Sequence, residues 1–531
     1  MLGTIFKQFN NQTIKQYNNT TIHSIKIMIS TNRLYFGDNL DFLRNWDYFP
    51  SESVDLIYLD PPFNSSQSYN VLFKDIEGAP ATAQIKAFED TWRWDEKSAK
   101  ALYEINSVVE YTPQPLVALL DMLEGFLGHS PMFAYLTQMS VRLVELYRIL
   151  KKSGSLFLHC DPTASHYLKL VLDAIFGPKL FRNEIIWSYR RWTAKSKRFQ
   201  RMHDVILFYA KEKPLFNTLY EPYGDWIKKD YSYVDEDGRR WRWHSPHGVR
   251  QKVYLKDPDR GVPINDVWII PFIGSTSKER MGYPTQKPLA LLKRIIQASS
   301  NPGQIILDPF CGCGTTIDAV ETLNQENPDK PLRKWIGIDI THLAIDLIKY
   351  RLATRFEIEK DHYDVIGEPT TITEAYALAK EDRYQFQYWA LGLISARPWG
   401  EKKKGADRGI DGYRSFIHGT RRTYTKCIIQ VKSGKVNPAM IRDLKGTMER
   451  ENAEMSAFIT LEKPTPAMTA ESASAGFYHS EVMNRDYPRM QILTIRQLLK
   501  DQDCFKIPPG GGLMGAPKFI SKTNSQKEFF K

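Results

Sequence analysis

Residues 306–316 read ILDPFCGCGTT, an apolar run that leads into a glycine-rich turn. The apolar run predicts a buried β-strand, and the residues after the turn predict the start of a helix. Gly312 and Gly314 allow the backbone to turn sharply and to approach a ligand closely. Glycine spacing alone also fits an ordinary turn, but a strand, a glycine-rich turn and a helix in this order favour an α/β fold that binds a nucleotide-type cofactor.

The next predicted strand ends in an acidic residue. Residues 335–340 read WIGIDI, so Asp339 follows the turn at a spacing of about 20 residues, where a carboxylate can accept hydrogen bonds from ribose hydroxyls. This pair of features favours an adenosine cofactor. The turn lacks the fuller GxGxxG pattern of nicotinamide sites and begins with Asp308, which can hold a charged amino group. S-adenosylmethionine therefore suits the loop better than a nicotinamide.

Strands and helices alternate over most of the chain before residue 357. Apolar runs predict strands at 53–59, 155–161 and 203–211, and helical spacing predicts helices at 131–150, 164–177, 289–300 and 341–356. Residues 212–282 lose this rhythm and are rich in Trp, Tyr, Arg, Lys and Pro, which indicates an inserted module. Residues 358–379 turn polar and are predicted to be a linker to a second, smaller α/β domain at 380–504, followed by a flexible tail at 505–531.

Length and composition set outer limits on the function. The 531 residues predict two or three domains, and the formal net charge of +11 gives modest support for a polyanionic partner. The five cysteines include no CxxC pair, which argues against a disulfide framework and a structural zinc site. There is no run of 18 apolar residues and no signal-peptide pattern, so we expect a cytoplasmic protein without a membrane partner. Residues 1–30 are rich in Asn, Thr and Gln and are predicted to be a disordered lead, or to precede the true start at Met28.

Three motifs resemble those of the amino-group DNA methyltransferases. They are DPPF at 60–63, YPTQKP at 283–288 and DPFCGCGTT at 308–316, and the resemblance covers roughly residues 31–355. The catalytic motif precedes the cofactor motif, as in the β class of this family, whose Rossmann-like domain is circularly permuted. The resemblance implies a permuted Rossmann-like methyltransferase domain at 31–357 with 212–282 as its target-recognition insertion. It also implies S-adenosylmethionine as the cofactor and double-stranded DNA as the substrate.

The resemblance assigns a role to each residue of the DPPF motif. An exocyclic base amine is a poor nucleophile because its lone pair is delocalised into the ring. The Asp60 side chain and the Pro61 carbonyl are expected to accept hydrogen bonds from this amine, Pro62 to stiffen the loop, and Phe63 to stack on the base. A base inside a duplex cannot reach such a loop, so the target nucleotide must flip out. The leading Asp resembles the adenine-N6 members more than the cytosine-N4 members, although the two groups overlap.

Further ligand-binding residues follow from the same resemblance. The expected cofactor-binding residues are Asp38, Thr285, Lys287, Asp308, Pro309, Phe310, Gly312, Gly314, Thr315 and Asp339. Asp38 could equally be a helix N-cap. The expected DNA-binding residues of the insertion are Arg239, Arg240, Trp241, Arg242, Trp243 and Arg250, and the alternative is a solvated β-rich insertion without base contacts.

A second constellation lies near the C-terminus. Residues 405–412 read GADRGIDG and residues 427–434 read CIIQVKSG, which resembles the Mrr-like branch of the PD-(D/E)xK nucleases across roughly 380–500. The resemblance makes Asp411 the ligand of a Mg²⁺ ion, places Gln430 where most relatives carry Glu, and makes Lys432 the catalytic lysine. Arg408 in place of a glycine, and Gln385 and Gln387 where an acid is often found, depart from the pattern. A solvated hairpin, or an inactive nuclease fold that only binds DNA, remains the alternative.

The leading hypothesis is a restriction-modification protein that carries an adenine-N6 methyltransferase and a nuclease-like domain in one chain. A homodimer or a separate restriction subunit is a possible partner. The first alternative is a solitary methyltransferase, acting on adenine N6 or cytosine N4, whose C-terminal domain only binds DNA. A non-enzymatic DNA-binding protein with a methyltransferase-like fold is the second. An RNA methyltransferase is the third, but it gives no reason for a nuclease-like companion.

Overall fold

The computed structural model describes residues 31–509 except for 63–67, 75–79, 90–91, 108–111, 192–194, 196, 198, 257–258, 275–276, 284, 400–408 and 420–422. The predicted disordered lead, most of the predicted tail, and Phe63 and Arg408 therefore lie outside the described residues. Within the described part of the chain, no helix is long and apolar enough to cross a membrane.

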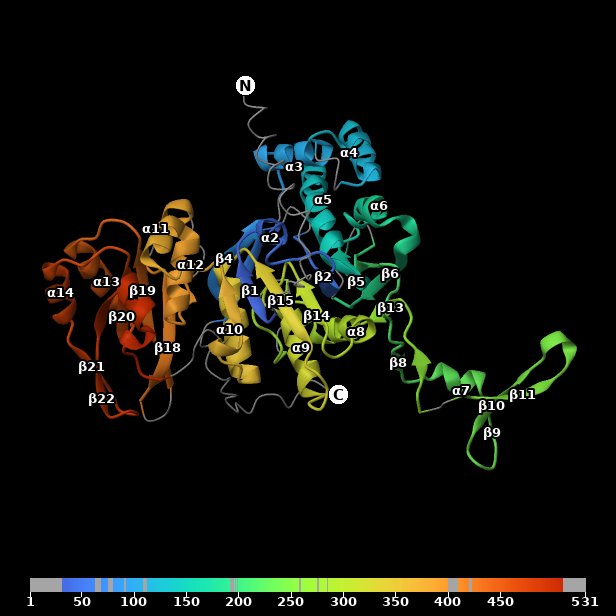
Figure 1. Ribbon diagram of the computed structural model, residues 1–531. Coiled ribbons are helices and arrows are strands. Elements are labelled where there is room, and N and C mark those ends of the chain that lie inside the picture. The colour runs from blue at the N-terminus through green and yellow to red at the C-terminus, as the bar shows by residue number, and fades with distance from the viewer. Residues whose placement is uncertain are drawn as a thin grey trace, which may run out of the picture.

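A nine-stranded sheet forms the centre of the N-terminal domain (Figure 1), with the strand order β13-β6-β7-β5-β2-β14-β15-β1-β16. The six strands from β5 to β16 in this order run parallel, and β7 runs antiparallel to both of its neighbours. The bounds are β1 Arg33–Phe36, β2 Val54–Leu59, β5 Leu150–Cys160, β6 Phe181–Ser188, β7 His203–Ala210, β13 Val267–Ile269, β14 Ile305–Asp308, β15 Lys334–Asp339 and β16 Asp364–Ile366. The strands predicted at 53–59, 155–161 and 203–211 are confirmed as β2, β5 and β7.

Helices cover both faces of this sheet because successive strand side chains point to opposite sides. In β5, Leu156 and Leu158 pack with one group of helices, whereas Phe157 faces the other group. The first group is α2 Asn39–Leu43, α3 Glu96–Ser107, α4 Gln114–Leu127, α5 Pro131–Ile149 and α6 Ser165–Phe176, and the second is α8 Leu289–Ser299, α9 Thr315–Gln325 and α10 His342–Phe356. The predicted α/β class is confirmed as a three-layer fold.

The strand order brings the two principal motifs together. β2, which leads into Asp60, lies beside β14, which ends at Asp308, with Leu56 opposite Ile306 and Ile57 opposite Leu307. Parallel neighbours end at the same edge of a sheet, so the two aspartates meet there although they are far apart in the sequence. β2, which leads into the DPPF motif, precedes β14 and β15 along the chain, which confirms the permuted Rossmann-like arrangement.

The inserted module is shorter than predicted. The range 212–282 includes β13, which returns to the main sheet and pairs with β6 through Val267 and Ile186. The part outside that sheet extends away from the domain as an arm (Figure 1). The arm contains β8 Tyr220–Glu221, α7 Trp226–Asp230, β9 Tyr233–Val234, β10 Arg240–His244, η2 Pro246–Gly248, β11 Gln251–Tyr254 and β12 Val262–Pro263.

The C-terminal domain contains a five-stranded sheet with the order β17-β18-β19-β20-β23. Its strands are β17 Arg397–Pro398, β18 Gly412–His418, β19 Thr423–Lys432, β20 Met455–Thr460 and β23 Met490–Thr494, and a small hairpin joins β21 Phe477–Ser480 to β22 Arg485–Pro488. Its helices are α11 Ile372–Glu381, α12 Arg383–Leu393, α13 Pro438–Arg450, α14 Pro466–Ala473 and α15 Ile495–Lys500. The remaining elements of the chain are the hairpin of β3 Ser68–Lys74 and β4 Pro80–Glu89 and the short helices η1 Pro178–Leu180, η3 Lys360–His362 and η4 Gln502–Cys504.

The predicted linker at 358–379 requires a correction. It contains β16, the edge strand of the main sheet, and most of α11, which begins with a capping box formed by Thr371 and Glu374. Ala375 and Ala379 of α11 are buried in the core of the C-terminal domain. The predicted tail also begins too early, because Phe505 belongs to the same core. The two domains therefore follow one another with little intervening chain, and α10 packs directly against α12, where Tyr388 contacts a cluster containing Leu343 and Leu347.

Candidate functional site

A cavity of about 490 Å³ lies at the carboxyl edge of the main sheet, where β2, β14 and β15 end. Of the predicted residues, those that line it are Asp38, Asp60, Pro62, Thr285, Lys287, Asp308, Pro309, Phe310, Gly312, Thr315 and Asp339. Pro61 is buried and Gly314 lies at the start of α9, and neither lines the cavity. Residues of the DPPF motif and of the glycine-rich turn, which lie far apart in the sequence, therefore line one cavity.

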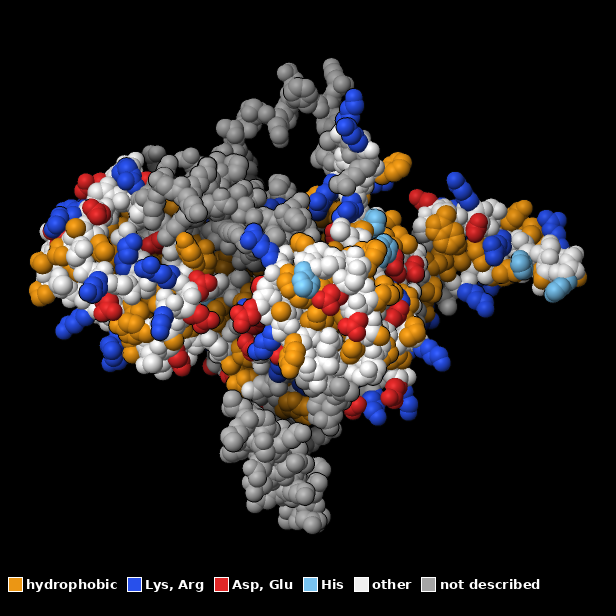
Figure 2. Space-filling view, turned by 90° about the horizontal axis from the view of Figure 1, so that it is seen from above, with side chains coloured by type: hydrophobic (Ala, Val, Ile, Leu, Met, Phe, Trp, Pro, Cys, Tyr) orange, Lys and Arg blue, Asp and Glu red, His pale blue; other side chains and the backbone are white. Residues whose placement is uncertain are grey.

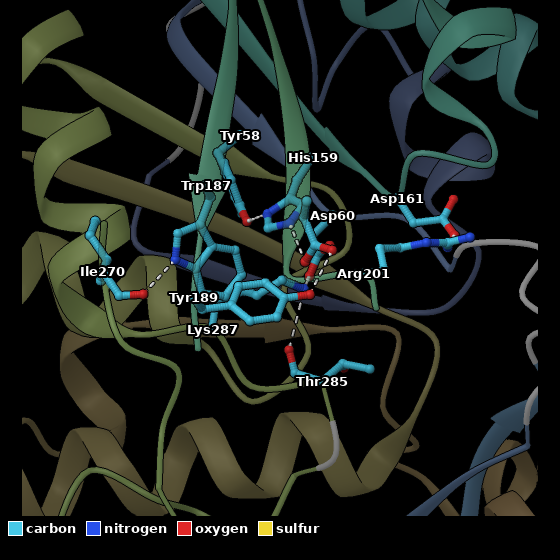
Figure 3. Close-up of polar contacts among 11 residues, drawn as sticks. Tyr58, Asp60, His159, Asp161, Trp187, Tyr189, Arg201, Ile270, Thr285 and Lys287 are labelled. Atoms are coloured by element: carbon cyan, nitrogen blue, oxygen red, sulfur yellow. Dashed lines mark hydrogen bonds and ion pairs between the residues drawn. The ribbon is translucent and has the colours of Figure 1, made fainter. Parts of the chain in front are cut away.

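Asp60 lines this cavity, and its two carboxylate oxygens have different surroundings. Its Oδ2 forms an ion pair with the Lys287 ammonium group, which also contacts the Thr285 carbonyl oxygen at 3.4 Å (Figure 3). Its Oδ1 is buried and has no hydrogen-bond partner among the described residues. A buried acceptor without a donor is costly, so a ligand that brings an N–H group to this oxygen gains the missing hydrogen bond.

Asp308 lies at the base of the cofactor loop. Its carboxylate accepts hydrogen bonds from the Thr316 hydroxyl at 2.5 Å and from the Phe310 backbone N–H at 3.1 Å. Burial raises the pKa of Asp308 to about 7, the two hydrogen bonds oppose this rise, and the nearby charges of Asp60 and Asp339 add to it. A cationic group in the cavity would favour the ionised form, so this position suits a positively charged ligand.

The glycine-rich loop is folded around Asp339. The Asp339 carboxylate accepts hydrogen bonds from the Gly312 N–H at 2.9 Å and from the Thr341 N–H and hydroxyl at 2.8 and 2.7 Å. Gly314, with a φ of 76°, takes the left-handed conformation that L side chains rarely adopt and begins α9. The loop geometry therefore depends on a glycine at one end and on an acid from the neighbouring strand at the other.

Asp38 is the helix N-cap that the sequence offered as an alternative to cofactor binding, and it also faces the cavity. It caps α2 by accepting a hydrogen bond from the Leu40 N–H at 3.0 Å. Its carboxylate pairs with the Arg142 guanidinium at 2.7 Å. Arg142 also donates to Asn39, whose side chain donates to the Pro309 carbonyl oxygen at 2.7 Å. This chain of contacts ties the start of α2 to the cofactor loop.

Several lining residues were absent from the sequence prediction. They include Trp92, Arg93, Gln138, Arg142 and Tyr283. The indole N–H of Trp92 is buried without a partner among the described residues, so it offers a hydrogen-bond donor to a ligand. For Gln138 and Arg142 a signal existed, because polar residues four apart on the buried face of α5 are unusual in a helix core.

The arm combines cations with aromatic rings, and Figure 2 shows Lys, Arg and His side chains among hydrophobic ones along it. Trp241 is buried against Tyr233 with ring centroids 4.5 Å apart, so it builds the core of the arm. Trp243 is exposed, and the Arg250 guanidinium lies 4.5 Å above its ring. Arg240 is half-buried, and its guanidinium donates to a backbone carbonyl of the arm. The predicted DNA-binding residues therefore divide into structural and accessible ones.

Two other arginines of the arm lie close to acids. Arg239 pairs with Asp235 and Asp237 at 3.3 and 3.0 Å, and the Arg242 guanidinium lies 3.8 Å from Asp230. These carboxylates reduce the positive charge available to a polyanion.

In the C-terminal domain, Asp411 and Gln430 lie at the β18–β19 hairpin. The buried Asp411 carboxylate accepts a hydrogen bond from the Val431 N–H at 2.8 Å. The Gln430 amide donates to the Gly409 carbonyl oxygen at 3.2 Å, and its own Oε1 is buried without a partner among the described residues. Lys432 ends β19. The structure describes no group of three or more His, Cys, Asp or Glu residues that could hold a metal, so the hairpin offers Mg²⁺ one carboxylate and one amide oxygen.

Comparison with known proteins identifies two family matches. Residues 54–350 match the N6/N4 family of DNA methylases, and residues 378–485 match a restriction endonuclease family of Mrr type. Among curated relatives, the Type II methyltransferase M.EcaI of Enterobacter cloacae is 30% identical over 272 residues, which is 41% of this chain and 58% of that protein. The Type II methyltransferase M.HpaI of Haemophilus parainfluenzae is 32% identical over 217 residues, 40% of this chain and 58% of that protein. The DNA adenine methyltransferase YhdJ of Escherichia coli K12 is 27% identical over 334 residues, 61% of this chain and 84% of that protein.

Proposed function

Because this chain belongs to the N6/N4 family of DNA methylases, as its three motifs predicted, we propose that it transfers a methyl group from S-adenosylmethionine to adenine N6 of duplex DNA. The observation that carries the proposal is the buried, unpartnered Oδ1 of Asp60 at the wall of the cavity. An exocyclic amine carries the N–H donor that this oxygen lacks. Accepting that hydrogen bond draws the nitrogen lone pair out of the ring and toward the methyl group.

The cofactor-binding residues fit S-adenosylmethionine by their chemistry. Bound there, the cofactor would supply an electrophilic methyl group on a sulfonium. Asp308 can hold a cationic part of the molecule, since a positive charge would stabilise its ionised form. Asp339 is half-buried, and its carboxylate oxygens can accept hydrogen bonds from the ribose hydroxyls. The backbone at Gly312 can approach the ligand closely because glycine has no side chain.

Lys287, an expected cofactor-binding residue, lines the cavity, and its ammonium group also pairs with Asp60. This pairing fixes Oδ2 and leaves Oδ1 for the substrate. Asp60 then acts as an oriented hydrogen-bond acceptor rather than as a strong base, which is sufficient to activate an amine whose proton leaves after the methyl group arrives.

The arm is the proposed reader of DNA. A pair of antiparallel strands can enter a major groove. β10 and β11 form such a pair, to which β9 adds a short third strand, with the exposed Trp243 on β10 and Arg250 in the turn before β11. The target base must leave the duplex to reach Asp60, at a cost of a few kcal/mol. Contacts between the arm and the DNA can offset that cost.

Asp60→Ala tests the proposal. With labelled S-adenosylmethionine and duplex DNA, we expect kcat to fall by roughly 10²-fold or more, since the variant lacks the acceptor for the amine. The matched control is Asp329→Ala, which removes an exposed carboxylate and should leave kcat unchanged. Equal rates in both variants would refute the role of Asp60.

For the C-terminal domain we propose a second activity, Mg²⁺-dependent DNA cleavage. The unpartnered Gln430 Oε1 supports it, because a buried oxygen without a donor is a position that a cation can satisfy. Lys432→Ala should abolish cleavage and leave methylation intact. If no Mg²⁺-dependent cutting is found in the unmodified protein, the domain serves DNA binding alone.

A further inference from the structure

A buried polar network crosses four neighbouring strands beneath the catalytic loop (Figure 3). The Tyr58 hydroxyl of β2 lies 3.0 Å from Nδ1 of His159 in β5, and Nε2 of His159 lies 3.2 Å from Oδ2 of Asp204 in β7. The hydroxyl of Tyr189, which follows β6, donates to Oδ1 of Asp204 at 3.1 Å. The strands contribute in their spatial order β2, β5, β7 and β6. The sequence suggested nothing beyond an apolar strand for His159.

The hydrogens of this network can be assigned from its chemistry. Burial by itself raises the pKa of Asp204, but the hydrogen bond from His159 and the positive charge of Lys287 lower it below its ordinary value. An ionised carboxylate only accepts hydrogen bonds, so the hydrogen shared with Asp204 lies on Nε2 of His159. In the neutral imidazole, Nδ1 then accepts a hydrogen bond from the Tyr58 hydroxyl. His159 is completely buried, and both oxygens of Asp204 are held in place.

The network reaches the reaction through Lys287. This ammonium group pairs with Asp60, and both residues line the same cavity as Tyr58, the first residue of the network. The positive charge of Lys287 also lowers the pKa of Asp204. Lys287 therefore acts on one carboxylate in the catalytic loop and on one in the buried network. Because Asp204 also attracts the Lys287 cation, that cation neutralises the Asp60 carboxylate less completely.

We propose that His159 and Asp204 are positioning residues for methyl transfer, which fix a second carboxylate beside Lys287 and so keep Asp60 a strong acceptor for the target amine. The inference rests on the proposed function of Asp60. It assigns His159 and Asp204 no contact with the base or the cofactor. Tyr58 and Tyr189 hold the two ends of the network.

Asp204→Asn provides the first test because it removes the charge and nearly keeps the shape. Lys287 then interacts with Asp60 alone and makes it a weaker hydrogen-bond acceptor for the amine. We therefore expect kcat for methyl transfer to decrease about tenfold, with KM for S-adenosylmethionine changed by less than about twofold. The loss should vanish when Lys287 is already replaced. In a Lys287→Met background, Asp204→Asn should cause no further decrease, whereas a merely structural role would give the same decrease in both backgrounds.

His159 offers a matched pair of substitutions. His159→Gln keeps an N–H donor that can reach Asp204, and His159→Phe keeps the ring volume without the donor. We expect the Gln variant to retain most of the kcat and the Phe variant to behave like Asp204→Asn. Equal activities in the two variants would overturn the inference.

A chemical measurement tests the same contact without using the activity. Lys287 loses one of its two anions in Asp204→Asn, so acetic anhydride should label it several-fold faster, as measured by peptide mass spectrometry. Unchanged labelling would overturn the inference. Absence of any methyl transfer by the unmodified protein would instead refute the proposed function, and this result is separate from the labelling result.

Discussion

Replacing Gly314 by Ala should weaken the cofactor loop through two separable effects. The residue has a φ of 76°, and the left-handed conformation costs an L residue about 1–2 kcal/mol. A Cβ added there would lie 2.5 Å from Cγ1 of the buried Ile348, and such overpacking costs about 1–3 kcal/mol. The sum is a loss of about 2–5 kcal/mol in the free energy of unfolding.

Gly303→Ala is the matched control for this change. Gly303 has a φ of 86°, but an added Cβ would meet only Cβ of Pro331 at 3.5 Å, an ordinary contact. Both variants have the same cost of the left-handed backbone and the same entropy change of the unfolded chain. The difference between their free energies of unfolding therefore measures the clash with Ile348. Calorimetric melting of the N-terminal domain and titration with S-adenosylmethionine should show a larger loss in Gly314→Ala. If both variants melt alike and bind the cofactor alike, the packing argument is refuted.

Two further predictions concern the ligands. The folded pKa of Asp308 is about 7 and lies above its ordinary value, so the ionised form that a cationic ligand needs increases as the pH rises through about 7. Affinity for S-adenosylmethionine, measured by calorimetric titration, should therefore rise between pH 6 and pH 8, and Asp308→Asn should bind weakly with little pH dependence. Arg250→Ala should weaken DNA binding and reduce the slope of log affinity against log salt by about one. An unchanged slope in a fluorescence titration would exclude a phosphate contact by Arg250.

Local patterns predicted the central fold well. The run at 306–316 contains its own strand, turn and helix start, and each part depends mainly on neighbouring residues. The same holds for α5 and α10, whose apolar spacing extends over many turns. The resemblance placed Asp60 and Asp308 in one domain, and in the fold β2 and β14 are neighbours, so that both aspartates line one cavity.

Features that depend on residues far away in the chain could not be predicted from the sequence. β13 has three residues within an aromatic, polar stretch and exists because β6 offers it a sheet edge. α11 buries mainly small residues such as Ala375, which give a weak apolar signal until the C-terminal core is known. His159 lies in an apolar strand, and only the fold shows that Asp204 from β7 faces it.

The most direct test of the account is to identify the modified base. Duplex DNA incubated with the protein and S-adenosylmethionine is digested to nucleosides and analysed by mass spectrometry. The account predicts N6-methyladenine with the unmodified protein and none above background with Asp60→Ala. N4-methylcytosine would contradict the assignment to adenine, and the absence of any methylated nucleoside would contradict methyl transfer itself.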